Sequence, residues 1–248
     1  MHNRVLQNFN LDACYGKTLL KDGTKIIDKF KSLKLSGANV TVPHKEYAFK
    51  LCNEAKGIAC DIKAVNTLVK DGDKVYGYNT DAIGFYESIS SFKNLKHVLI
   101  LGAGGTAKAI AFILRKNGAE VTILNRSAKR LDFFQKSGFK TSSWDNFKTY
   151  RYDLIINTTT AGLNESILPL EKELLSSLMQ NSSYAFDVIY GKETPFLKLA
   201  KESSLIYKDG SDMLLYQAVF AFNLFYNNRF KTEDIEKEMR KAFNLAYI

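Results

Sequence analysis

Apolar runs of strand length alternate with amphipathic stretches through most of the chain, and this alternation is typical of an α/β protein. Short apolar runs bounded by turn residues predict strands over residues 14–20, 38–42, 65–69 and 74–78. The last two form a hairpin, because the turn-forming pair Asp71-Gly72 separates them. Helical spacing predicts the end of a helix over residues 4–9 and helices over residues 24–33 and 45–52.

The second half of the chain continues the alternation. A helix from Asp81 leads to strands that helical segments separate, at residues 97–101, 121–124, 153–157 and 184–188. Alternating strands and helices in both halves predict parallel sheets. The chain ends in an apolar helix over residues 212–226 and an amphipathic helix over residues 232–246. We expect these to pack back on the first domain, which gives a discontinuous domain of residues 1–83 and 212–248 and a second domain of residues 84–211.

A glycine-rich turn lies between the predicted strand at residues 97–101 and a segment with helical spacing. Its sequence, Gly102-Ala103-Gly104-Gly105-Thr106-Ala107, is a G-x-G-x-x-A pattern in the strand–turn–helix context of a dinucleotide site. Gly102 permits the tight turn, Gly104 lets a pyrophosphate approach the backbone, and Ala107 keeps the helix close to the strand. The helix N-terminus then faces the phosphates. A glycine-rich turn without a ligand is the alternative, and the complete context favours the dinucleotide.

The identity of the dinucleotide should be visible at the end of the next strand. There Asn125 is followed by Arg126, Ser127 and Arg130, where an NAD site usually has an acidic residue that accepts from the ribose 2′-hydroxyl. Arg126 can bind a 2′-phosphate through two parallel hydrogen bonds, and Ser127 and Arg130 add donors. The alternative is a solvated basic helix start, which the positive end of a helix disfavours. The pattern therefore predicts NADP as the cofactor.

Polar residues lie at the ends of apolar strands predicted in the first half of the chain. They belong to the stretches Asn39–Lys45, Ala64–Thr67 and Asn79–Asp81. Each stretch alone is typical of a solvated turn, because burying an unpaired charge is expensive. Three of them ahead of a dinucleotide pattern predict a functional site, because strand ends are rigid places from which to aim side chains.

Composition fits a globular protein with one large or two medium domains. The chain has 248 residues, of which 46% are hydrophobic. No apolar run reaches membrane-spanning length and no signal-peptide core is present, so we expect a cytoplasmic protein and no membrane partner. The three cysteines lack metal-ligand spacing, so no metal is expected. The net charge of +9 is spread among acidic residues, which argues against nucleic acid and favours a small anionic substrate.

Taken in order, these motifs resemble those of the shikimate dehydrogenase family over essentially the whole chain. Further matching stretches are Asn157–Gly162, Phe186–Tyr190 and Asp209–Gln217. The resemblance implies NADPH-dependent reduction of 3-dehydroshikimate to shikimate, a step towards chorismate and the aromatic amino acids. It also implies a discontinuous α/β substrate domain and a Rossmann-like NADP-binding domain with a parallel sheet.

The resemblance also implies roles for particular residues. Lys45 would exchange the proton, because a lysine can donate in one direction and accept in the other, and Asp81 would orient Lys45 and bind a substrate hydroxyl. The rest of the substrate pocket would be Thr41, Asn66, Tyr190 and Gln217. Thr158, Gly210 and Met213 would join the glycine turn and the basic cluster in binding NADP. His44 is interpreted as structural, because a neighbour along a strand end usually points elsewhere.

One departure concerns the start of the chain. Members of the family normally begin with a strand and a loop in which two serines bind the substrate carboxylate, just before a His-Asn pair. His2-Asn3 matches the end of that motif, and only Met1 precedes it. We therefore expect an unpaired seam in the first sheet and weaker substrate binding. A start codon assigned at an internal methionine explains this more simply than a shortened protein.

Two other functions stay open on the sequence. A quinate/shikimate dehydrogenase with broader substrate or NAD use would share these motifs, although the basic cluster argues against NAD. A non-catalytic NADP-binding protein would have no physical reason to keep Lys45, Asn66, Asp81 and Gln217. The oligomeric state is also open, with a homodimer as one option.

Overall fold

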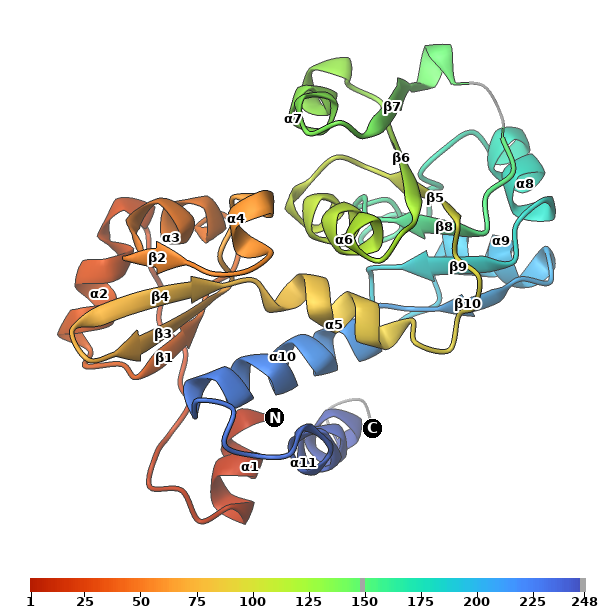
Figure 1. Ribbon diagram of the computed structural model, residues 1–248. Coiled ribbons are helices and arrows are strands. Elements are labelled where there is room, and N and C mark those ends of the chain that lie inside the picture. Colours follow the sequence, from red (N-terminus) through yellow and green to blue (C-terminus); the bar gives the residue numbers. More distant parts are fainter. Residues whose placement is uncertain (148–149, 246–248) are drawn as a thin grey trace. The chain divides into compact units, whose positions relative to one another are not determined.

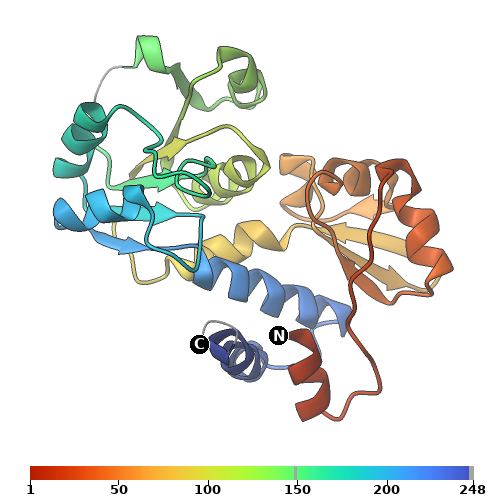
Figure 2. The same cartoon turned by 180° about the vertical axis from the view of Figure 1, so that it is seen from behind.

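The chain folds into two compact α/β units, each with its own sheet (Figure 1). The computed structural model describes residues 1–147 and 150–245. Unit 1 consists of Met1–Phe85 and Leu214–Ile248, and unit 2 consists of Tyr86–Met213. Unit 1 is thus built from both ends of the chain, and the two termini are marked on it in Figure 1 and, from behind, in Figure 2.

Unit 1 combines a small sheet with helices from both chain ends. The elements that begin within its N-terminal part are α1 (His2–Asn8), the 3₁₀ helix η1 (Gly23–Lys25), α2 (Ile26–Ser32), β1 (Gly37–Asn39), α3 (Lys45–Leu51), β2 (Glu54–Ala55), α4 (Ala59–Ile62), β3 (Thr67–Asp71), β4 (Lys74–Tyr78) and α5 (Thr80–Ser88). The C-terminal part supplies α10 (Ser211–Phe225) and α11 (Thr232–Leu245). Helices α5 and α10 each continue from one unit into the other.

The sheet of unit 1 is mixed, in the order β1-β3-β4-β2. β3 is antiparallel to both β1 and β4, and β2 is parallel to β4. The hairpin prediction is confirmed, with Gly72 in the left-handed region at φ +57° between its strands. The prediction of a parallel sheet is wrong here, because a two-residue connection can join only antiparallel neighbours. Apolar side chains of α2, α3 and α4 cover one face of this sheet (Figure 1).

The predicted strand over residues 14–20 is absent. Residues 12–22 contain no helix or strand, and among the described residues β1 pairs with β3 alone. A strand needs a partner for its backbone groups, and this segment has none, so its apolar pattern does not form a ladder. The segment is instead fixed at Tyr15, whose backbone N–H and C=O bond the side chain of Asn3 at 2.7 and 2.9 Å.

Helices α1, α10 and α11 form a second packing layer of unit 1. Their core contains apolar side chains from all three helices: Val5, Leu6, Leu215, Ala218, Val219, Phe222, Ile235 and Met239. Arg4 on α1 and Glu238 on α11 add an ion pair at 3.1 Å. The two chain ends therefore hold each other mainly through burial of apolar surface.

Unit 2 is a six-stranded parallel sheet, which confirms the predicted Rossmann-like fold. Its elements are β5 (His97–Leu101), α6 (Gly105–Lys116), β6 (Glu120–Asn125), the 3₁₀ helix η2 (Ala128–Leu131), α7 (Asp132–Lys136), β7 (Lys140–Ser143), the 3₁₀ helix η3 (Trp144–Asn146), β8 (Leu154–Asn157), α8 (Lys172–Gln180), β9 (Tyr184–Asp187), α9 (Pro195–Glu202) and β10 (Ile206–Lys208). The sheet order is β10-β9-β8-β5-β6-β7. The strand order reverses between β5 and β8, because β6 and β7 follow on one side of β5 whereas β8, β9 and β10 follow on the other. Ligands of such sheets bind at this switch point, beside the carboxyl ends of the strands.

Helices cover both faces of this sheet. α8 and α9 pack on one face through a core that includes Leu99, Ile155 and Leu197, and α6 lies on the opposite face (Figure 1). The central strands are therefore almost entirely apolar, as parallel strands buried on both faces must be. The sequence analysis did not predict the short strands β2, β7 and β10. Their residues are largely polar or exposed, such as Ile206 at 61% exposure, so they lack the apolar run of a buried strand.

His2 makes the stability of unit 1 sensitive to acid. The ring is 8% exposed, stacks on Tyr15 with centroids 4.0 Å apart, and its Nε2 has no hydrogen-bond partner in the described structure. Burial lowers the pKa of His2 from 6.5 to about 4. Because the folded pKa lies below the unfolded one, stability is lost as pH falls from 6.5 through about 4.

We predict that His2→Phe removes this acid sensitivity. The loss in the wild type should approach about 3 kcal/mol at the acid end, the free energy that corresponds to this pKa difference. Denaturant unfolding of both proteins across the mildly acid range measures it. Parallel stability–pH curves for wild type and variant would contradict the prediction.

Candidate active site

Lys45 and Asp81 form an ion pair in unit 1, with Nζ and Oδ2 2.6 Å apart. Both side chains are largely shielded, at 22% and 15% exposure. Lys45 is the first residue of α3 and Asp81 lies in the first turn of α5, so helix starts rather than strand ends position them. A carboxylate at the first turn of a helix interacts favourably with the helix dipole, which suits the position of Asp81 at the start of α5.

Asn66 joins this pair from the other side of the carboxylate. Its amide nitrogen donates to Asp81 Oδ1 at 2.9 Å and to Thr80 Oγ1 at 3.0 Å. Asn66 is 3% exposed and immediately precedes β3, whereas the predicted strand over residues 65–69 included it. Both oxygens of Asp81 thus have a donor, and charge-assisted hydrogen bonds of this kind fix the orientation of a carboxylate.

The remaining residues predicted for the substrate pocket have different surroundings. Thr41 is exposed, and its carbonyl accepts the His44 N–H at 2.9 Å. Gln217 lies on α10, where a Cβ added at Gly84 of α5 would come within 2.6 Å of its backbone nitrogen. The helix that holds Asp81 therefore packs against α10 at a point where only glycine fits. Tyr190 follows β9 in unit 2 and is 44% exposed.

His44 connects the loop before η1 to the start of α3. Its Nε2 lies 2.8 Å from the Leu20 carbonyl oxygen, which can only accept, so Nε2 holds the proton. Nδ1 is buried without a hydrogen-bond partner in the described structure. The ring is therefore engaged with the backbone rather than with Asp81.

The glycine turn of unit 2 has open space where a phosphate would lie. Gly102 has φ +105°, and a Cβ there would be 2.6 Å from Thr158 Oγ1, so the turn requires glycine. At Gly104 and Gly105 a Cβ would meet nothing within 4 Å. Gly104 caps α6 and no side chain caps that helix, so the backbone N–H groups of its first turn face this space. Thr158 itself donates to the Leu101 carbonyl at 2.7 Å.

The basic cluster lies at the end of β6. The Asn125 amide donates to the Ser127 carbonyl at 2.9 Å and so closes the turn that contains Arg126. Arg126 and Arg130 are exposed, and neither forms an ion pair with any residue of the described ranges. Near α10, Gly210 packs directly on the Val188 carbonyl, and Met213 is 9% exposed. Free guanidinium groups and uncapped helix donors together fit a phosphorylated dinucleotide.

Two family models match the chain, and between them they cover most of both units. Residues 1–68 match the shikimate dehydrogenase substrate binding domain, and residues 87–188 match shikimate / quinate 5-dehydrogenase. A curated relative from Helicobacter hepaticus, named shikimate dehydrogenase (NADP(+)), is 44% identical over 245 residues, which are 98% of this chain and 91% of that protein. The chain belongs to the shikimate dehydrogenase family.

Solved structures of the shikimate dehydrogenase family have the same fold. The enzyme from Aquifex aeolicus superposes with a TM-score of 0.84 at 32% identity and covers 96% of this chain and 90% of its own. The enzyme from Thermus thermophilus, solved in complex with NADP(H) and shikimate, gives a TM-score of 0.83 at 30% identity and covers 97% and 92%. The similarity therefore extends through both units.

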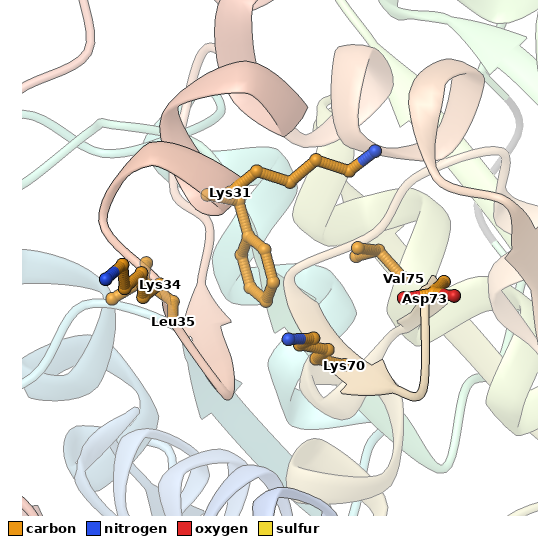
Figure 3. Close-up of a pocket in the computed structure, with 7 residues that line it drawn as sticks. Lys31, Lys34, Leu35, Lys70, Asp73 and Val75 are labelled. Atoms are coloured by element: carbon orange, nitrogen blue, oxygen red, sulfur yellow. The ribbon is translucent and has the colours of Figure 1, made fainter.

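A cavity of about 360 Å³ in unit 1 lies apart from the predicted residues. Its lining comes from α2, the segment after it and the β3–β4 hairpin: Phe30, Lys31, Lys34, Leu35, Lys70, Asp73 and Val75. Figure 3 shows the side chains of Lys31 and Lys34 extending in different directions, so their ammonium groups do not converge on one ligand. None of the residues that the family resemblance names lines this cavity.

The site contains residues that the sequence interpretation missed. Thr67 and Thr80 are fully buried beside Asn66, and the backbone N–H of Thr80 donates to Asn66 Oδ1 at 2.7 Å. Each follows an asparagine of a recognised motif, which is the signal that could have found them.

Within residues 1–147 and 150–245, no helix is long and apolar enough to cross a membrane, and no acidic, His or Cys cluster could hold a metal.

Proposed function

We infer that the chain is an NADP-dependent shikimate dehydrogenase, which reduces 3-dehydroshikimate to shikimate reversibly on the way to chorismate. The observation that carries this inference is the Lys45–Asp81–Asn66 cluster in a chain so similar to enzymes of that name. NADP-dependent oxidation of shikimate by the purified protein, followed through NADPH absorbance, tests it. Absence of this activity in a folded protein would reject the inference.

The reaction needs a hydride at the ketone carbon and a proton at its oxygen. Bound NADPH would supply the hydride, and the glycine turn and basic cluster would hold the cofactor. The Lys45 ammonium would donate the proton to the developing alkoxide, and in the reverse direction the neutral amine would accept it. Asp81, bonded to Nζ at 2.6 Å, keeps that ammonium in one position. Hydride and proton together convert the ketone to the alcohol.

We assign residues 1–83 and 212–248 to the substrate-binding domain and residues 84–211 to the NADP-binding domain, with Tyr190 and Met213 as the two exceptions among the site residues. The substrate-binding set is Thr41, Asn66, Asp81, Tyr190 and Gln217. The cofactor-binding set is Gly102, Ala103, Gly104, Gly105, Thr106, Ala107, Asn125, Arg126, Ser127, Arg130, Thr158, Gly210 and Met213. The open glycine turn and the unpaired arginines support the second set, and the bonded Asn66–Asp81 cluster supports the first. The small anionic substrate and a cytoplasmic location belong to the same proposal.

A quinate/shikimate dehydrogenase is the second candidate, because one matching family model is named for both substrates. The relatives at 44% and 47% identity are named for shikimate and NADP(+) alone. Rates with shikimate and quinate, each measured with NADP and NAD, separate the two candidates. Comparable rates with quinate would favour the broader enzyme.

Lys45→Ala and Asp81→Ala should each lower turnover by roughly 10²–10⁴, the range for a positioned acid or base. The double variant should be far from additive, because Lys45 and Asp81 act as one unit. Steady-state rates test this, with NADPH fluorescence as the control that unit 2 still binds the cofactor. Near-normal turnover of Lys45→Ala would exclude it as the proton donor.

Arg126→Ala should weaken NADPH binding by on the order of 1.5–3 kcal/mol and leave NADH binding almost unchanged, because only NADPH has the 2′-phosphate. Titration of both cofactors measures the difference. Arg151, which is exposed in the same unit, supplies the matched control Arg151→Ala. Equal loss of both cofactors in Arg126→Ala would make this arginine structural.

The two glycines of the turn should separate stability from binding. Gly104→Ala has open space and should melt like the wild type, yet it should bind NADPH weakly, because its methyl group occupies the place of the pyrophosphate. Gly102→Ala should lower the melting temperature, because alanine is strained at φ +105° and meets Thr158. Melting curves with and without NADPH measure both effects. Undiminished NADPH binding by Gly104→Ala would count against the site.

A further inference from the structure

A line of hydrogen-bonded side chains runs through unit 1 from Tyr15 to Asp81. The Tyr15 hydroxyl lies 2.9 Å from Asn39 Oδ1, and Asn39 Nδ2 lies 3.5 Å from Thr67 Oγ1. Thr67 Oγ1 lies 2.9 Å from Asn66 Oδ1, and Asn66 Nδ2 lies 2.9 Å from Asp81 Oδ1. The Asn39–Thr67 contact is the longest of these links. None of these residues except Asn66 and Asp81 has a role in the proposed function.

The direction of each hydrogen bond follows from the groups that can only donate or only accept. The backbone N–H of Thr80 donates to Asn66 Oδ1 at 2.7 Å, so the amide oxygen lies on that side and the NH₂ group faces Asp81. That NH₂ uses its two protons on Asp81 Oδ1 and Thr80 Oγ1. The Thr67 hydroxyl donates its single proton to Asn66 Oδ1, and its oxygen then accepts from Asn39 Nδ2 at 3.5 Å and from the Thr80 hydroxyl at 3.1 Å.

The second amide, that of Asn39, lies between the hydroxyls of Thr67 and Tyr15, and the Thr67 oxygen requires a donor from it. Burial raises the pKa of Tyr15, so its phenol is neutral and can donate to Asn39 Oδ1. The Asn39 NH₂ group is then on the side of Thr67. Every link therefore donates towards the Asp81 carboxylate. Aligned hydrogen bonds of this kind polarise and strengthen one another.

We propose that Thr67 is a positioning residue for the Lys45–Asp81 pair, and that Tyr15 supports it through Asn39. The Thr67 hydroxyl donates to Asn66 Oδ1 at 2.9 Å, closer than the Thr80 hydroxyl at 3.2 Å, and with the Thr80 N–H it keeps the Asn66 amide turned with its NH₂ group on Asp81. A reversed amide would place its oxygen against the carboxylate and release Asp81 from the orientation that meets Lys45. Thr67 is 0% exposed, so it acts through Asn66 and has no contact with solvent or substrate. This inference rests on the proposed function.

The decisive comparison uses Thr67→Val, which removes the hydroxyl and keeps the branched shape, and Thr67→Ser, which keeps the hydroxyl. Thr67→Val should lower kcat for shikimate oxidation by roughly 5- to 30-fold with KM for NADP unchanged, and Thr67→Ser should recover most of that loss. Tyr15→Phe should lower kcat by a smaller factor, because its effect passes through the long Asn39–Thr67 link. Tyr226→Phe is the matched control, since the Tyr226 hydroxyl has no hydrogen bond in the described structure. The Tyr226 ring packs on Phe222, and the substitution keeps that contact. It should leave kcat unchanged.

The same substitution in an Asp81→Asn background distinguishes positioning from packing. Without the carboxylate, Thr67→Val should change the remaining kcat by less than about twofold, whereas a packing defect would lower it by the same factor in both backgrounds. Equal factors, or full kcat of Thr67→Val in the wild-type background, would overturn the proposal. An inactive but folded wild-type chain would instead reject the proposed function.

A measurement that does not need turnover completes the test. The side-chain amide protons of Asn66 should exchange with solvent faster in Thr67→Val than in the wild type, as followed by NMR. Equal exchange in the two proteins would show that Thr67 does not hold the amide and would overturn the proposal even if no activity were found.

Discussion

The hydrogen bonds of Asn66 are the interaction on which the rest of the candidate site depends. Asn66, Thr67 and Thr80 are almost completely buried, and a buried polar group without a partner costs about 1–3 kcal/mol. Here each donor and acceptor of the Asn66 amide has a partner, so the cluster has one favourable arrangement. The partly exposed Lys45–Asp81 pair inherits its geometry from that buried arrangement. An exposed ion pair alone would be worth little and would have no fixed orientation.

Unit 2 obeys the same constraint at the carboxyl ends of β8 and β9. Asp187 is fully buried, and burial raises the pKa of its carboxyl group. Three donors surround it: the Asn157 amide at 3.1 Å, the Ile189 N–H at 3.1 Å and the Thr194 hydroxyl at 2.6 Å. Thr194 also caps α9. A satisfied polar cluster thus fixes the loops beside the switch point, as the Asn66 cluster fixes the start of α5.

The sequence predicted the parts of the structure that local chemistry determines. The glycine turn is one example, because strand, turn and helix are contiguous and each residue type has its own reason. The Lys45–Asp81 ion pair was an implication of family resemblance, because a sequence separation of 36 hides the contact from any local pattern. The failed strand at residues 14–20 has the opposite cause: its apolar pattern is correct for a strand, but pairing is a property of the whole sheet. Thr67 was missed because a buried threonine in a strand looks like packing.

The division into two units has a consequence for how substitutions combine. Lys45, Asn66 and Asp81 are bonded to one another within unit 1, while the glycine turn and Arg126 belong to unit 2. Residues of one hydrogen-bonded network are expected to be strongly non-additive, because the first substitution already releases the others. Residues without shared partners add their free energies. Pairs drawn from the two units should therefore combine independently in cofactor binding, and pairs within the Asn66 cluster should not. Two substitutions are therefore expected to have non-additive effects when both residues share hydrogen bonds with the buried Asn66 amide or its partner Asp81, whatever the number of charged groups nearby.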